Sequence, residues 1–215
     1  MRRLFTTFAI AFAVVTPASA HHPLGGMPME TFTHGVLSGF GHPILGFDHL
    51  FFIIAVGITA ALYSRRLSAP LAYIGAMLIG CLVTALWSST LVNEFLVACS
   101  LLILGSMLLS GKQFSTQIVV ASFGLFGLFH GAAFGETLAA QEAAYGLPVL
   151  IGYLIGLGVT QYLVAIAAGS VLIKIADAAH AGALEARLAG AMVAGAGLLL
   201  VFEHLEGPII ALVAS

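Results

Sequence analysis

The sequence predicts an all-α membrane protein, a bundle of about six transmembrane helices. The first indication is composition, because 60% of the 215 residues are hydrophobic and only 7% are charged. Soluble domains carry about a quarter charged residues, so this chain cannot cover itself with polar surface. The second indication is a series of long apolar runs, each near the ~20 residues that cross a bilayer as a helix. These runs cover residues 43–64, 69–89, 91–110, 114–135, 147–175 and 184–213.

Residues 1–20 have the pattern of a cleaved signal peptide. Arg2 and Arg3 precede a short apolar core, and Ala18-Ser19-Ala20 supplies small residues at the cleavage position. Residues 21–215 then form a single transmembrane domain. Cleavage would expose His21 and His22, where a free α-amine beside an imidazole can chelate a metal; a solvated terminus is the other interpretation.

The stretch before the first long run predicts a short N-terminal helix. Prolines and glycines make the beginning of this stretch a loop, whereas residues 30–40 have weak helical spacing. This segment is too short to cross the membrane, so we expect a re-entrant or interfacial helix.

Orientation follows from the basic residues. A cleaved signal places the mature N-terminus outside, so the loops after the first, third and fifth runs face the cytoplasm. These loops carry every basic residue of the mature chain, which agrees with the positive-inside rule: Arg65, Arg66, Lys112, Lys174 and Arg187. Most carboxylates lean toward the outer side, where they would concentrate cations. Both mature termini are therefore expected outside.

The most informative motif opens the first long run. His42, Asp48 and His49 place two imidazoles and a carboxylate at a membrane helix, where ionisable groups are costly. Imidazole and carboxylate suit borderline divalent metals such as Ni²⁺, Co²⁺ and Zn²⁺. Pro43 favours the first helical turn, so His42 is expected at or before the N-cap. An ideal helix would separate His42 and His49 by about 10 Å. Either the chain bends before Pro43, or the two histidines act separately.

A second candidate cluster lies in the fourth run. Gly127, Gly131 and Gly135 recur every four residues, so a neighbouring backbone can approach closely. His130 lies beside this stripe, and Glu136 is expected past the helix end. The groove is either a ligand wall or a packing surface with a hydrogen-bonded histidine.

A third cluster lies in the last run. Pro208 removes a helical hydrogen bond and clashes with the carbonyl of His204, so a kink or break is expected there. Glu203, His204 and Glu206 would then provide polar groups at membrane depth. Alternatively, the helix ends near residue 205 and these groups are solvated.

Two motifs and the signal peptide resemble those of the HupE/UreJ family: His-Pro-x-x-Gly-x-Asp-His at 42–49 and His-Gly-x-x-x-Gly-Glu at 130–136. Members are bacterial accessory proteins of hydrogenase and urease systems, regarded as secondary nickel or cobalt permeases. The resemblance implies an inner-membrane importer of Ni²⁺ or Co²⁺, with no enzymatic activity and no prosthetic group. His42, Asp48 and His49 carry over as metal-handling residues, and His130 and Glu136 as a second cluster. The family often has another histidine where this chain has Phe134.

Other interpretations stay open at this point. The cargo could be copper or zinc, or paired histidines could ligate haem. An intramembrane zinc hydrolase is a further alternative, although the His-Glu-x-x-His motif is absent from the sequence. The expected partners are a divalent metal ion and the lipid bilayer, with no nucleic acid. Gly152-x-x-x-Gly156 could support a homo-oligomer.

Overall fold

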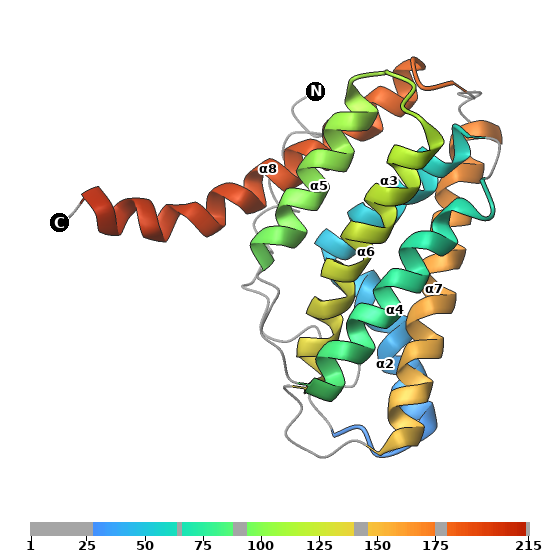
Figure 1. Cartoon of the computed structure of the whole chain (residues 1–215), viewed down its shortest axis with the longest axis vertical. Helices are drawn as coiled ribbons and strands as arrows, with labels where there is room; N and C mark the ends of the chain where they lie inside the picture. Colours follow the sequence, from blue (N-terminus) through green and yellow to red (C-terminus); the bar gives the residue numbers. More distant parts are fainter. Residues whose placement is uncertain (1–27, 64–65, 88–93, 140–145, 175–179, 214–215) are drawn as a thin grey trace, which may run out of the picture.

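The computed structural model describes residues 28–63, 66–87, 94–139, 146–174 and 180–213, and these residues form helices without any strand (Figure 1). The expected signal peptide, His21 and His22 lie outside the described residues. The all-α membrane class is confirmed. The helices are α2 (Phe32–Leu45), α3 (Phe47–Ala61), α4 (Ala69–Trp87), α5 (Glu94–Leu109), α6 (Thr116–Ala139), α7 (Leu147–Lys174) and α8 (Leu184–Val213).

Length and composition identify four of the described helices, α4, α6, α7 and α8, as membrane spans. The pair α2–α3 qualifies as a fifth span when the two helices are taken together. Helix α5 is apolar but has only 16 residues, about 24 Å at 1.5 Å per residue. It is therefore shorter than the ~30 Å hydrocarbon layer. The six expected runs thus correspond to four complete spans, one bent pair and one short helix.

Close backbone contacts organise the bundle into the helix pairs α4–α6, α2–α7 and α5–α8, with α3 between them. A Cβ atom at Gly131 would collide with the carbonyl of Met77, which confirms the close approach expected at this stripe. Gly152 and Gly156 likewise face the backbone of α2. These two glycines therefore support association of α7 with α2 inside the chain, and the homo-oligomer stays a prediction.

The first long run does not begin at residue 43 as expected. Helix α2 continues through Pro43 to Leu45, and α3 begins at Phe47 after a bend of 82°. Pro43 lies in the last turn of α2, where it removes the hydrogen bond that an N–H at this position would make to the carbonyl of Gly39, and the helix ends two residues later at Leu45. The bend is at Gly46, whose N–H donates to the carbonyl of His42 at 3.0 Å.

The two halves of this bent pair follow α7 in the same direction. Gly39 in α2 packs on the carbonyl of Tyr153, and Gly57 in α3 packs on that of Ala165. Because α7 is a single helix, the pair advances along it from one side of the bundle toward the other. The pair is therefore a broken span, and the re-entrant or interfacial helix expected at 30–40 is the first half of that span.

Helix α8 is continuous across Pro208, so of the kink or break expected there the break is wrong, and so is the alternative that the helix ends near residue 205. A kink within the helix can absorb the loss of one hydrogen bond. The C-terminal part of α8 extends away from the bundle in Figure 1. Its apolar side chains are exposed, including Leu212 at 78%, as expected for a surface that meets lipid. The broken helix is therefore α2–α3 rather than α8.

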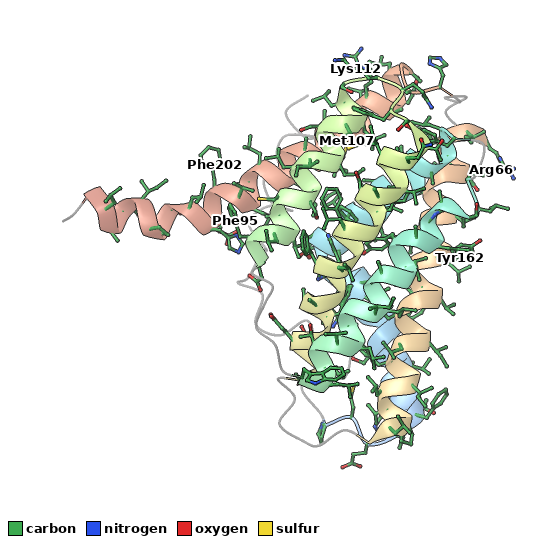
Figure 2. The ribbon with its side chains drawn as sticks, in the orientation of Figure 1. Arg66, Phe95, Met107, Lys112, Tyr162 and Phe202 are labelled. Atoms are coloured by element: carbon green, nitrogen blue, oxygen red, sulfur yellow. The ribbon has the colours of Figure 1, made fainter. Side chains whose placement is uncertain are left out.

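The basic residues of the described chain gather at one end of the bundle. Arg66 and Lys112 lie toward this end in Figure 2. Lys174 lines the same cavity as Arg66, and Nε of Arg187 donates to the carbonyl of Leu109 at 3.1 Å. This clustering provides the charge asymmetry by which membrane proteins are oriented.

Candidate metal site

Three imidazoles from three helices converge at the break between α2 and α3. His42 lies in the last turn of α2, His49 in the first turn of α3, and His130 in the second half of α6. Their exposed fractions are 6%, 7% and 0%. The ring centroids of His42 and His49 are 6.2 Å apart, and those of His49 and His130 are 5.2 Å apart. The bend at Gly46 thus brings His42 closer to His49 than a straight helix allows.

A hydrogen-bond chain fixes the direction in which His130 donates. Oγ of Ser100 donates to the carbonyl of Val97 at 2.7 Å and lies 2.8 Å from Nε2 of His130. A hydroxyl has one proton, so Ser100 must accept the proton of Nε2. Neutral His130 then carries its lone pair on Nδ1, which lies 3.0 Å from Nδ1 of His49. His49 therefore donates from Nδ1 and carries its own lone pair on Nε2.

Aromatic side chains enclose these imidazoles. The Phe52 ring stacks on His130 with centroids 4.1 Å apart, and the Phe134 ring lies 4.1 Å from His49 and 5.1 Å from His42. The hydroxyl of Tyr153 is within 3.2 Å of Nδ1 of His42. Water is thereby largely excluded, which strengthens electrostatic interactions with any ion that enters.

Sequence reasoning did not identify Ser100 or Tyr153 as members of the site. Both belong to long apolar runs without a motif, and both are buried, at 1% exposed each. A polar residue deep in a transmembrane run is itself a signal, because it must find a partner in the bundle. That signal marks candidates but does not identify the partner.

Asp48 lies beside the histidine cluster and is half-buried. Its Oδ2 is 3.8 Å from Nε2 of His49, beyond hydrogen-bonding distance but close enough for charge attraction. Gly46 is part of this arrangement, because an added Cβ would lie 3.0 Å from Cδ2 of His49 and 3.3 Å from Oδ1 of Asp48. The Nε2 lone pair of His49 and the Asp48 carboxylate can therefore face the same cation.

The remaining predicted site residues lie elsewhere. Glu136 is within α6, not past its end, and is six residues beyond His130 on a different face. Nδ1 of His204 lies 2.8 Å from the carbonyl of Leu200, and its Nε2 lies 3.5 Å from Oε2 of Glu94. Glu203 and Glu206 are exposed on α8. The structure therefore does not bring the predicted α8 cluster into the histidine site.

In the described residues, no three His, Cys, Asp or Glu side chains are already arranged around a common metal position. The Nδ1 lone pair of His130 accepts the hydrogen bond from Nδ1 of His49 at 3.0 Å, so His130 could bind an ion through this nitrogen only after that hydrogen bond breaks. Binding by His49 through Nε2 and by His130 through Nδ1 would therefore require the two rings to turn away from each other.

Comparison with known proteins identifies the family of the chain. The family described as HupE / UreJ protein matches residues 9–200. The chain belongs to the HupE/UreJ family. Protein HupE of Rhizobium leguminosarum bv. viciae is 27% identical over 202 residues, covering 93% of this chain and 97% of that protein. No solved structure gives a significant match. Membership of the HupE/UreJ family supports a membrane protein that transports a metal.

Proposed function

We propose that this protein is a secondary transporter that imports Ni²⁺ or Co²⁺ across the bacterial inner membrane. The observation that carries the proposal is the convergence of His42, His49 and His130 at a helix break inside the membrane domain. Broken helices with polar groups at membrane depth are the usual way in which transporters build ion sites. Imidazole nitrogens select borderline metals over Mg²⁺ or Ca²⁺, which prefer oxygen ligands.

In this proposal His42, His49 and Asp48 bind the ion as it enters, and His130 completes the nitrogen set. His130 has its lone pair on Nδ1 because Ser100 holds the proton on Nε2, so it is prepared as a ligand. Metal-bound imidazoles typically donate their second N–H to a neighbouring oxygen in this way. Glu136, Glu203 and His204, with His21 and His22 at the mature N-terminus, would attract cations before they reach the histidines.

The basic end of the bundle supports the orientation. Arg66, Lys112, Lys174 and Arg187 face the cytoplasm in this proposal, and the mature N-terminus and the C-terminus face the periplasm. The histidine site then receives ions from the periplasmic side, where most of the carboxylates are expected to lie.

The test is metal binding by purified full-length protein, with Ni²⁺, Co²⁺, Cu²⁺ and Zn²⁺ offered separately. Wild type is compared with His49→Ala and with His180→Ala, a control on the exposed residue that precedes α8. We expect Ni²⁺ or Co²⁺ to bind wild type and His180→Ala, and His49→Ala to lose this binding and cellular uptake. Preference for Cu²⁺ or Zn²⁺ would reassign the cargo. Unchanged uptake in His49→Ala would refute the proposed site.

A further inference from the structure

Gln161 of α7 is a fully buried amide, and neither Oε1 nor Nε2 has a hydrogen-bond partner within the described part of the chain. Its neighbour Thr160 is 2% exposed, and its Oγ1 also lacks a partner there. A buried polar group without a hydrogen bond costs about 1–3 kcal/mol. A leucine or methionine would avoid this cost, so the amide requires an explanation other than stability.

The packing register places these two residues at the end of α2. Gly35 packs on the carbonyl of Val149, and Gly39 packs on that of Tyr153 four residues later in both helices. Continuing this register by one turn brings Pro43 between Leu157 and Gln161. Gly152 and Gly156 of α7 also pack on the backbone of α2. Thr160 continues this four-residue spacing, so it is placed against α2 one turn beyond Gly156.

The end of α2 is itself a cation-attracting feature. The bond from Gly46 N–H to the His42 carbonyl closes the last turn. The carbonyls of Pro43, Ile44 and Leu45 follow, and the last carbonyls of a helix have no partners inside it. They also carry the negative end of the helix dipole. In broken membrane helices such C-terminal ends commonly coordinate cations.

Gln161 also lies between the histidine site and the basic end of the bundle. Tyr153, which contacts His42, and Ala165 share one face of α7 with Gln161, two turns before it and one turn after it. Ala165 lines a cavity of about 80 Å³ together with Arg66 and Lys174. The two basic side chains would repel a cation that reached that cavity. The cavity is therefore suited to releasing the cation rather than to binding it.

We propose that Gln161, Thr160 and the carbonyl end of α2 form a second, oxygen-lined station for the transported cation, between the histidines and the cytoplasmic cavity. This inference rests on the proposed transport function. Oxygen ligands hold Ni²⁺ or Co²⁺ less tightly than imidazoles do. The station therefore lets the ion leave the histidines in steps, and conduction requires sites that bind weakly enough to release.

The test compares wild type with Gln161→Leu, Gln161→Glu and the control Gln117→Leu, in which an exposed glutamine of α6 is changed. Three quantities are measured on the full chain: equilibrium Ni²⁺ and Co²⁺ binding, radiolabelled uptake into proteoliposomes, and the thermal unfolding midpoint. In Gln161→Leu we expect uptake to fall at least about tenfold, histidine binding to persist, and the unfolding midpoint to stay or rise. Gln161→Glu, which adds charge at the station, should bind more tightly and release more slowly.

The outcomes separate this inference from the proposed function. If wild type neither binds nor transports Ni²⁺ or Co²⁺, the proposed function fails. If wild type transports and Gln161→Leu transports equally well, only the second station is refuted. A clear loss of thermal stability in Gln161→Leu but not in Gln117→Leu would show that the amide is a structural hydrogen-bonding group, which also overturns the inference. Gln161→Glu with unchanged binding and uptake would contradict it as well.

Discussion

Nδ1 of His49 lies 3.0 Å from Nδ1 of His130, although 81 residues separate them in the chain. The contact joins the first turn of α3, which is the second half of the broken span, to α6, which is an unbroken span. Each imidazole has a different second neighbour: Asp48 for His49 and Ser100 for His130. The two rings therefore form a polar unit that connects the helix break to α5 and α6.

Ser100→Ala should weaken metal binding although Ser100 is not itself a ligand. Without the serine oxygen, Nε2–H of His130 loses its acceptor, and the lone pair is no longer held on Nδ1. Changes to such supporting groups typically reduce metal affinity about 10–100-fold. The measurements are Ni²⁺ titration and ¹⁵N NMR of the imidazoles, which reports the tautomer.

Ser106→Ala on the same helix is the control, because Ser106 is exposed. An unchanged tautomer and an unchanged affinity in Ser100→Ala would contradict the hydrogen-bond direction assigned to His130.

Gly131→Ala should destabilise the pair α4–α6 and disturb the site. Its new methyl group would collide with the carbonyl of Met77, a backbone atom that cannot move independently. Overpacking of this kind costs about 1–3 kcal/mol. We expect a lower thermal unfolding midpoint in detergent and weaker Co²⁺ binding, because His130 is the adjacent residue.

Gly124→Ala provides the matched control on α6, where an added Cβ meets nothing within 4 Å. Alanine at an unobstructed helix position is preferred to glycine by about 0.5–1 kcal/mol. That variant should be as stable as wild type or more stable. Equal loss of stability in both variants would show that helix propensity, rather than close packing, is responsible.

Tyr153→Phe should reduce the metal affinity of the site by removing the hydroxyl next to Nδ1 of His42. The lost hydrogen bond contributes about 0.5–1.5 kcal/mol, so the expected effect is modest. Isothermal titration with Ni²⁺ measures it. Tyr162→Phe on the same helix is the control, since that hydroxyl donates to the carbonyl of Leu67 at 3.2 Å, outside the site. The prediction fails if both variants bind metal equally.

Phe134→His should create a tighter site. The Phe134 ring lies against both His42 and His49, so an imidazole there would add a fourth nitrogen donor. We expect Ni²⁺ or Co²⁺ affinity to rise about tenfold, equivalent to 1.4 kcal/mol. Because a buried imidazole without metal is costly, the apo variant should unfold at lower temperature and recover stability when metal binds.

Phe123→His places a histidine at another fully buried position of α6 and should not raise the affinity. An equal gain in the two variants would indicate nonspecific binding by added histidines.

The sequence predicted most of the helices because hydropathy alone defines where a chain can cross a bilayer. The span containing residues 43–64 was the exception. The usual preference of proline for a first turn led to the wrong end of the helix, because Pro43 lies in the last turn of α2, just before the bend at Gly46. Pro208 illustrates the reverse case, in which a helix with exposed apolar side chains continues past a proline.

The candidate site was predicted only in part, for a physical reason. His42, Asp48, His49 and His130 are recognisable by residue type and spacing. Ser100 and Tyr153 act through contacts between helices that are distant in sequence, and no local pattern encodes those contacts. Glu203 and His204 have a suggestive composition, but α8 diverges from the bundle and keeps them away from the histidines.

Gly46 alone joins α2 to α3, so insertions and deletions beside it affect the structure differently from substitutions. A substitution at most positions changes one side chain, but an added or deleted codon beside Gly46 would rotate all of α3 by about 100° relative to α2. His49 would then leave His130, and Gly57 would leave Ala165, in one event. The number of residues between His42 and His49 is therefore as important to the site as the two histidines themselves.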